Sequence, residues 1–167
     1  MVKADFREYF RTEAKAVITQ AKRNLANNPH DKRGYRRINA TGRLRDSLKA
    51  RVYRKTLAFY MQDYGETVDA GLTGQSGKIQ SNWNKSLFPR GRITTAPPTT
   101  RMWQWMGQKG IQNKGGGMAY NIAQKIRREG LQPKLFFSDA WQNREKKFIN
   151  GLNEFWDKTI TESLKEE

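Results

Sequence analysis

The chain has 167 residues, which suits one domain with a buried core, and no cysteine, which excludes a disulfide scaffold, a thiol nucleophile and every thiolate metal site. Its 32 Lys and Arg residues against 16 Asp and Glu give a net charge of +16, which indicates a polyanionic partner or acidic protein neighbours. The charge is uneven: residues 1–138 hold 27 bases and 9 acids, a net +18, whereas residues 139–167 hold 5 bases and 7 acids, a net −2. Charge alone leaves both kinds of partner open.

The N-terminal part is predicted to be helical. Apolar side chains recur at steps of three and four over residues 4–27, as in an amphipathic helix. Pro29 ends this pattern, since proline disfavours helical backbone in the residue before it. A polar, basic loop follows from His30 to Asn39, and a short helical segment over 41–48 would be capped by Thr41.

Three strands are expected after this segment, because apolar and polar residues alternate over 48–52, 57–61 and 68–72. Leu48 and Val52 also fit a continuation of the preceding helix, so the first strand has a helical alternative. The three segments together would form a small antiparallel sheet.

Residues 73–99 show no periodicity and contain three prolines, which predicts an extended arm or loop within the domain. The segment has four apolar anchors, Trp83, Leu87, Phe88 and Ile93. We expect these anchors to pack on another surface, such as that of a neighbouring copy.

The C-terminal part is again helical in pattern. Two short helices are expected around 101–109 and 118–129, each ending at a glycine followed by an aliphatic residue, as in a left-handed helix stop. Ser138 is predicted to cap the last helix, whose apolar stripe continues to Leu164. This order of elements over all 167 residues predicts a single α+β domain, with N-terminal and C-terminal helices packed on the small antiparallel sheet.

The residue types do not favour catalysis. His30 is the only imidazole, and its polar, basic loop favours a solvent-exposed role over that of a general base. Asp63, Glu66 and Asp69 form the densest acidic cluster, but their alternating neighbours favour a solvated turn and strand over a cation site. We therefore expect no enzymatic activity, no metal and no cofactor.

Two further motifs have less specific interpretations. The glycines over 115–117 lack the Gly-Lys-Ser/Thr of a phosphate loop, so a flexible connection between helices is favoured. Trp103 and Trp105 could stack on nucleic-acid bases, but their helical spacing favours a place in the core. No apolar run approaches the about 20 residues of a membrane span, and the first eight residues lack the apolar stretch of a secretory signal.

Four segments, in this order, resemble segments of the tail-completion or head–tail joining family of tailed-phage neck proteins. They are Thr41–Leu48 (TGRLRDSL), Met102–Ile111, Ala119–Pro133 and Phe136–Trp141 (FFSDAW). The resemblance implies an α+β subunit without catalysis that forms a sixfold or twelvefold homo-oligomeric ring below the portal. Its expected neighbours are the portal or an adaptor, tail proteins and the genomic DNA of the channel, but no membrane. Its expected location is the virion neck, or the host cytoplasm during assembly.

The predicted DNA- or partner-facing surface is the basic loop and the helix after it, specifically Arg33, Arg36, Arg37, Arg43 and Arg45. These bases could equally contact an acidic neighbouring ring. The alternative function is that of a free-standing basic nucleic-acid-binding protein, because the 59 residues from Ala70 to Arg128 include no acid.

Overall fold

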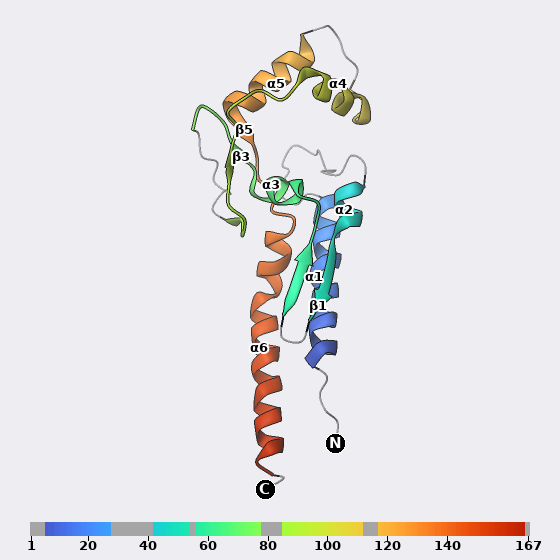
Figure 1. The fold of residues 1–167 in the computed structure, drawn as a ribbon, viewed down its shortest axis with the longest axis vertical. Coiled ribbons are helices and arrows are strands. Elements are labelled where there is room, and N and C mark those ends of the chain that lie inside the picture. Colours follow the sequence, from blue (N-terminus) through green and yellow to red (C-terminus); the bar gives the residue numbers. More distant parts are fainter. Residues whose placement is uncertain (1–5, 28–41, 54–55, 78–84, 112–116, 166–167) are drawn as a thin grey trace.

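A computed structural model describes residues 6–27, 42–53, 56–77, 85–111 and 117–165 of the chain. The described part is elongated, with a long helical pair and a hairpin at one end and a smaller helical unit at the other (Figure 1). None of the described helices is long and apolar enough to cross a membrane. The fold is α+β, as predicted.

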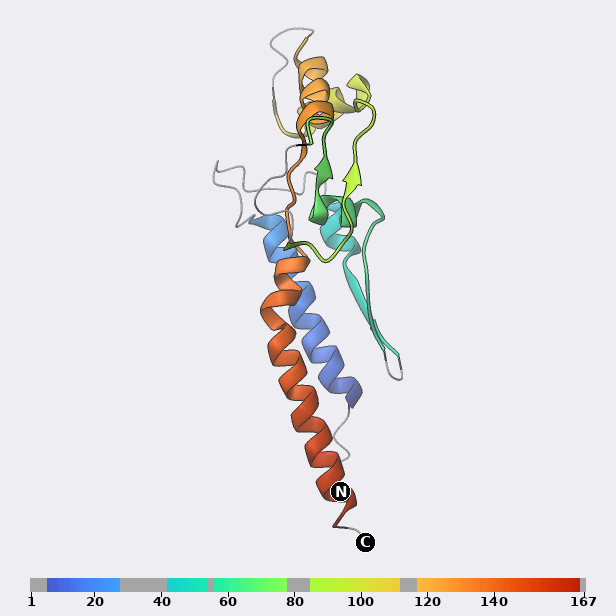
Figure 2. The same cartoon turned by 90° about the vertical axis from the view of Figure 1, so that its left-hand side faces the viewer.

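The long pair consists of α1 (Phe6–Ala26) and α6 (Ser138–Ser163), which run antiparallel side by side (Figure 2). The apolar side chains that recur at helical spacing on each helix face the other helix. The rings of Phe10 and Phe148, for example, stack with their centroids 5.4 Å apart. The predicted N-terminal and C-terminal helices are thus confirmed.

Polar contacts fix the alignment of α1 on α6. The Glu13 carboxylate is buried and accepts a hydrogen bond from Arg144 Nε at 3.0 Å and a second from Arg144 Nη2 at 3.3 Å. The Tyr9 hydroxyl donates to the carbonyl oxygen of Phe148 at 2.9 Å. Such groups stabilise one alignment of the two helices, because sliding would leave the buried carboxylate without its partner.

The first sheet is a hairpin of β1 (Lys49–Val52) and β2 (Leu57–Tyr60), preceded by the short helix α2 (Arg43–Ser47). The strands pair antiparallel, with Lys49 opposite Tyr60 and Val52 opposite Leu57. Phe59 on the inner face places its ring 5.2 Å from that of Phe137, so the hairpin packs on the start of α6. The two predicted strands in this region are confirmed, and Thr41, the predicted helix cap, lies outside the described residues.

The central core joins α1, α2 and the start of α6. Its buried side chains come from all three elements and are Val17, Ala21, Leu25, Leu44, Leu48, Phe136, Phe137 and Ala140.

The third predicted strand, 68–72, is wrong, because residues Tyr64–Ala70 form a helix, α3, and only Leu72–Thr73 are extended, as β3. Gly65 and Asp69, one helical turn apart, are both buried. A side chain at Gly65 would meet the side chain of Met61, which would have to move. The burial of Gly65 and Asp69 at helical spacing therefore outweighs the alternation of apolar residues in deciding the backbone conformation of this segment.

A second sheet has the strand order β4-β3-β5, in which β4 is Gly91–Arg92 and β5 is Gly130–Leu131. β3 pairs parallel with β4 and antiparallel with β5. This small sheet connects the body of the molecule to the helices α4 (Thr99–Gln108) and α5 (Met118–Glu129), which pack on each other (Figure 1).

The predicted glycine stop of α4 is confirmed in atomic detail. Gly110 has a φ of 66°, and its N–H donates to the carbonyl of Gly107 at 3.1 Å. The Ile111 N–H donates to the carbonyl of Met106 at 2.9 Å. These two bonds satisfy carbonyls that the end of a helix leaves without partners.

We expect the packing of α1 on α6 to lose stability at alkaline pH, because Tyr9 lies between the two helices. Burial raises the pKa of Tyr9 above its usual 10.0, and the negative charges of Glu13 and Glu154 add to this effect while Arg144 opposes it. A raised pKa in the folded state contributes stability below the unfolded pKa, and this contribution is lost as pH rises through the folded pKa. We expect the stability of the wild type to fall more steeply above about pH 10 than that of Tyr9→Phe. Urea unfolding midpoints of both proteins between about pH 8 and 11 measure this, and parallel curves would contradict it.

Candidate functional site

The candidate functional site is a basic, aromatic face on the outer side of the hairpin. Side chains on a strand alternate between two faces, so Ala50 and Val52 turn toward α1 while Lys49 and Arg51 are exposed. Tyr60 on β2 lies directly opposite Lys49. The outer face therefore combines positive charge with an aromatic ring.

The residues of this face contact one another. The guanidinium carbon of Arg51 lies 5.6 Å from the centre of the Tyr60 ring, a cation–π geometry. The hydroxyls of Tyr53 and Tyr60 are 2.9 Å apart. The hydrogen bond from Tyr60, and then that from Arg51, lowers the pKa of Tyr53 from its usual 10.0, whereas the bond to Tyr53 raises the pKa of Tyr60. We call Lys49, Arg51, Tyr53 and Tyr60 the hairpin face.

Two of the predicted basic residues lie on α2, and one of them, Arg43, lies beside this face. Arg43 is exposed and lines a hollow of about 390 Å³ together with Lys49 and Tyr60. Arg45 is paired with Asp46, with its Nε 3.0 Å from Oδ1. The other predicted bases, Arg33, Arg36 and Arg37, and also His30, lie outside the described residues.

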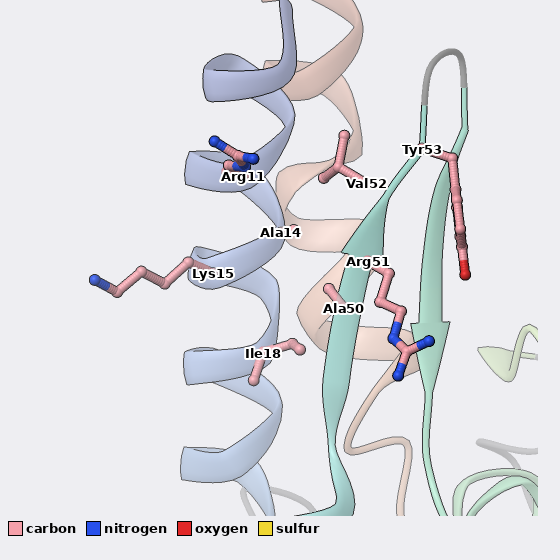
Figure 3. A pocket seen from close by; sticks show the side chains of 8 residues that line it. All are labelled: Arg11, Ala14, Lys15, Ile18, Ala50, Arg51, Val52 and Tyr53. Atoms are coloured by element: carbon pink, nitrogen blue, oxygen red, sulfur yellow. The ribbon is translucent and has the colours of Figure 1, made fainter.

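A groove lies between α1 and β1, on the opposite edge of β1 from β2 (Figure 3). Its volume is about 480 Å³. The apolar residues Ala14, Ile18, Ala50 and Val52 line its inner part. The other lining residues are Arg11, Lys15, Arg51 and Tyr53, so the groove has a basic rim and no acidic lining residue. We call it the α1–β1 groove.

The described part of the predicted arm packs on the rest of its own chain. Phe88 lies with its ring 5.9 Å from that of Phe137, and Ile93 is buried and donates its N–H to the carbonyl of Thr73 at 2.9 Å. Leu87 alone of the described anchors is largely exposed. Trp83 lies outside the described residues.

The acidic cluster has a structural role that the sequence did not reveal. Asp69 is fully buried, and its carboxylate accepts the N–H groups of Phe137 at 2.7 Å and of Ser138 at 3.1 Å. Asp63, directly before α3, and Glu66, on α3, are both exposed. The expected solvated strand is therefore wrong, and the part of the chain that the structure describes holds no group of three His, Cys, Asp or Glu suited to a metal ion.

Two exposed apolar surfaces belong to segments whose sequence pattern is typical of a core. Trp103 and Trp105 on α4 are 51% and 39% exposed, so the core interpretation is wrong for both.

On α6, four residues share one face, because steps of seven and four return to the same side of a helix. They are Ile149, Trp156, Ile160 and Leu164, 48–69% exposed, and we call them the α6 stripe.

The arrangement of these groups favours binding over bond-making chemistry. The hairpin face offers cationic donors and a stacking ring, a combination that suits phosphate groups and bases or an acidic protein surface. No family model, curated protein or solved structure matches this chain.

Proposed function

We propose that this chain is a structural subunit of a phage head–tail connector, a neck ring below the portal that surrounds the DNA channel and joins capsid to tail. The observation that carries the proposal is the exposed apolar stripe of α6, which lies at the opposite end of an elongated molecule from the basic helices α4 and α5. Contiguous exposed apolar surface marks contact sites between proteins.

Distinct surfaces at two ends of a subunit suit an assembly in which each copy contacts two neighbours. Contacts between different surfaces generate rings when the rotation closes. The proposed partners are further copies in a sixfold or twelvefold ring, the portal or an adaptor, tail proteins and genomic DNA. The proposed location is the neck of the virion.

The segments that resemble neck proteins support the proposal through their positions. Thr41–Leu48 leads into the hairpin, and Phe136–Trp141 holds the junction of α3, α6 and the hairpin. Two more of these segments form α4 and α5. The resembling segments therefore lie at the hairpin, at the start of α6 and in the helices α4 and α5.

Loss of the chain from an infecting phage tests this function. We expect particles made without it to accumulate as filled heads and separate tails, and the wild-type chain supplied in trans to restore joined particles. Electron microscopy of lysates with and without the supplied chain measures the fraction of joined particles. Joined, infectious particles in the absence of the chain would contradict the proposal.

A free-standing nucleic-acid-binding protein is the second candidate, and the hairpin face favours it. Replacing Lys49 and Arg51 together by alanine should make the negative slope of log K against log salt on duplex DNA shallower by about 1.8. This is about 0.9 for each phosphate that is no longer neutralised. The control is Lys146→Ala with Lys147→Ala, which removes the same charge from exposed positions on α6. Equal slopes for the two double variants, measured by fluorescence anisotropy, would exclude the hairpin face as a DNA-binding surface.

A further inference from the structure

We propose that the C-terminal end of α6 of one copy docks into the α1–β1 groove of a second copy. This inference rests on the proposed function, because it specifies the contact between neighbouring subunits. In this contact, the α6 stripe of one copy packs into the α1–β1 groove of the other.

The four residues of the α6 stripe are about half or more exposed within the described part of the chain, and Phe6 is the aromatic residue that contacts one of them, Trp156. The start of α1 meets α6 at Phe155 and Trp156, whose rings lie 5.3 Å and 6.2 Å from that of Phe6. From there α6 continues past the first described turn of α1 (Figure 2). Ile160 and Leu164 lie on this extension and are 55% and 69% exposed.

The stripe cannot reach the groove of its own copy. α6 is fixed along α1 by the Glu13–Arg144 ion pair and by the stacked Phe10 and Phe148 rings. It passes behind the groove, and the open side of the groove faces away from it (Figure 3). A second copy is therefore required to bring the two surfaces together.

Charge makes the two surfaces complementary. From Ile149 to the end the chain carries five acids and two bases, a net −3. On the α1 side, the groove rim carries Arg11 and Lys15, of which Arg11 lies 3.7 Å from Glu8 on its own helix. The rim with Glu8 included is still net positive, so it attracts an acidic helix and repels the basic remainder of a neighbouring copy.

The end of α6 and the α1–β1 groove also match in length and in polarity. From Trp156 to Leu164 the helix rises about 12 Å, and the groove extends about 11 Å along α1 from Arg11 to Ile18. Its apolar inner part would cover the stripe while the acidic flanks of α6 meet the basic rim. By contrast, the hollow between α1 and α6 is larger, about 550 Å³, but polar side chains such as Thr12, Thr19 and Gln20 line it.

The natural absence of cysteine permits a direct test. Full-length Ile160→Cys is mixed with full-length Val52→Cys, whose new thiol lies in the groove, and the mixture is oxidised. A disulfide between the two variants can form only between copies. We expect the mixed cross-link to exceed that of Ile160→Cys with Thr19→Cys, which lines the hollow between α1 and α6 and not the groove, by at least about tenfold.

A second measurement tests the apolar contact without cysteines. Ile160→Asp should weaken self-association in sedimentation experiments by at least about tenfold relative to Thr161→Asp, which adds the same charge one residue away and off the stripe. Thr161 is exposed, so its variant is a matched control for charge. Circular dichroism of both variants establishes that each remains folded.

The outcomes separate this contact from the proposed function. Equal cross-linking at Thr19→Cys, preferential cross-linking at Tyr120→Cys on α5, or no self-association at any soluble concentration would overturn the contact. The head–tail joining experiment is independent of all three results. A chain required for joining that does not cross-link at the groove would thus retain its proposed function and lose this interface.

Discussion

Replacing Asp69 by alanine is expected to lower the free energy of unfolding by about 3–5 kcal/mol, the largest effect of any single polar substitution in the described core. The carboxylate is 0% exposed and accepts the N–H groups of Phe137 and Ser138 at the start of α6. It also accepts the hydroxyls of Ser86, at 2.9 Å, and Ser138. Alanine would leave these donors buried without an acceptor, and α3, α6 and the segment around Ser86 would lose their common link.

Chemical denaturation of Asp69→Ala and two companion variants measures this effect. Asp69→Asn keeps one acceptor oxygen but loses the charge, so we expect a smaller loss than with alanine. Asp63→Ala removes a carboxylate from an exposed position six residues earlier and should change stability by no more than about 0.5 kcal/mol. A loss below about 1 kcal/mol for Asp69→Ala would show that the buried carboxylate is not the link described.

Replacing Gly130 by alanine is expected to cost about 3 kcal/mol or more. Gly130 has φ 80° and ψ −166°, a conformation that residues with a side chain rarely adopt. A Cβ there would also meet the carbonyl oxygen of Leu72 and lie 2.6 Å from the backbone nitrogen of Gly74. Because both neighbours are backbone atoms, one in β3 and one in the residue directly after it, the clash can be relieved only by separating β3 from β5.

Gly107→Ala is the matched control. Gly107 lies in α4, and a Cβ there has no other atom within 4 Å. The change should be neutral or stabilise the chain by up to about 1 kcal/mol, since alanine favours helix over glycine. Equal thermal midpoints for Gly130→Ala and the wild type would contradict the tight crossing of β3 and β5.

The long helices and the hairpin can be predicted because local pattern determines them. The apolar side chains of α1 recur at helical spacing, and the alternation in β1 places Ala50 and Val52 on one face. The glycine stops at Gly110 and Gly130 are visible in the sequence because both require a positive φ, which glycine adopts without strain. These features depend on residues close in sequence.

The errors lie where distant contacts decide the structure. The sequence predicts Ser138 as the cap of α6, but the cap comes from Asp69, and the Ser138 hydroxyl accepts the Leu87 N–H at 2.9 Å instead. The alternation at 68–72 suggests a strand, whereas the buried turn from Gly65 to Asp69 makes the segment helical. The periodicity of a single sequence carries no information on such pairings.

The candidate site can be predicted only in part. Charge density identifies Arg43, which lies beside the hairpin face, and Arg45, which is paired with Asp46 on α2. It does not identify Tyr53 and Tyr60, although their positions at the ends of two alternating strands are a usable signal. The α6 stripe continues the apolar pattern of the packed part of the helix, so the pattern alone cannot reveal where the cover of α1 ends.

The copy number of the chain in purified virus particles tests the central claim most directly. Quantitative mass spectrometry of particles from the source, scaled to the major capsid protein, measures it. A structural neck ring predicts a small fixed number, six or twelve per particle. Absence of the chain from the particle would contradict the ring and favour a free-standing nucleic-acid-binding protein.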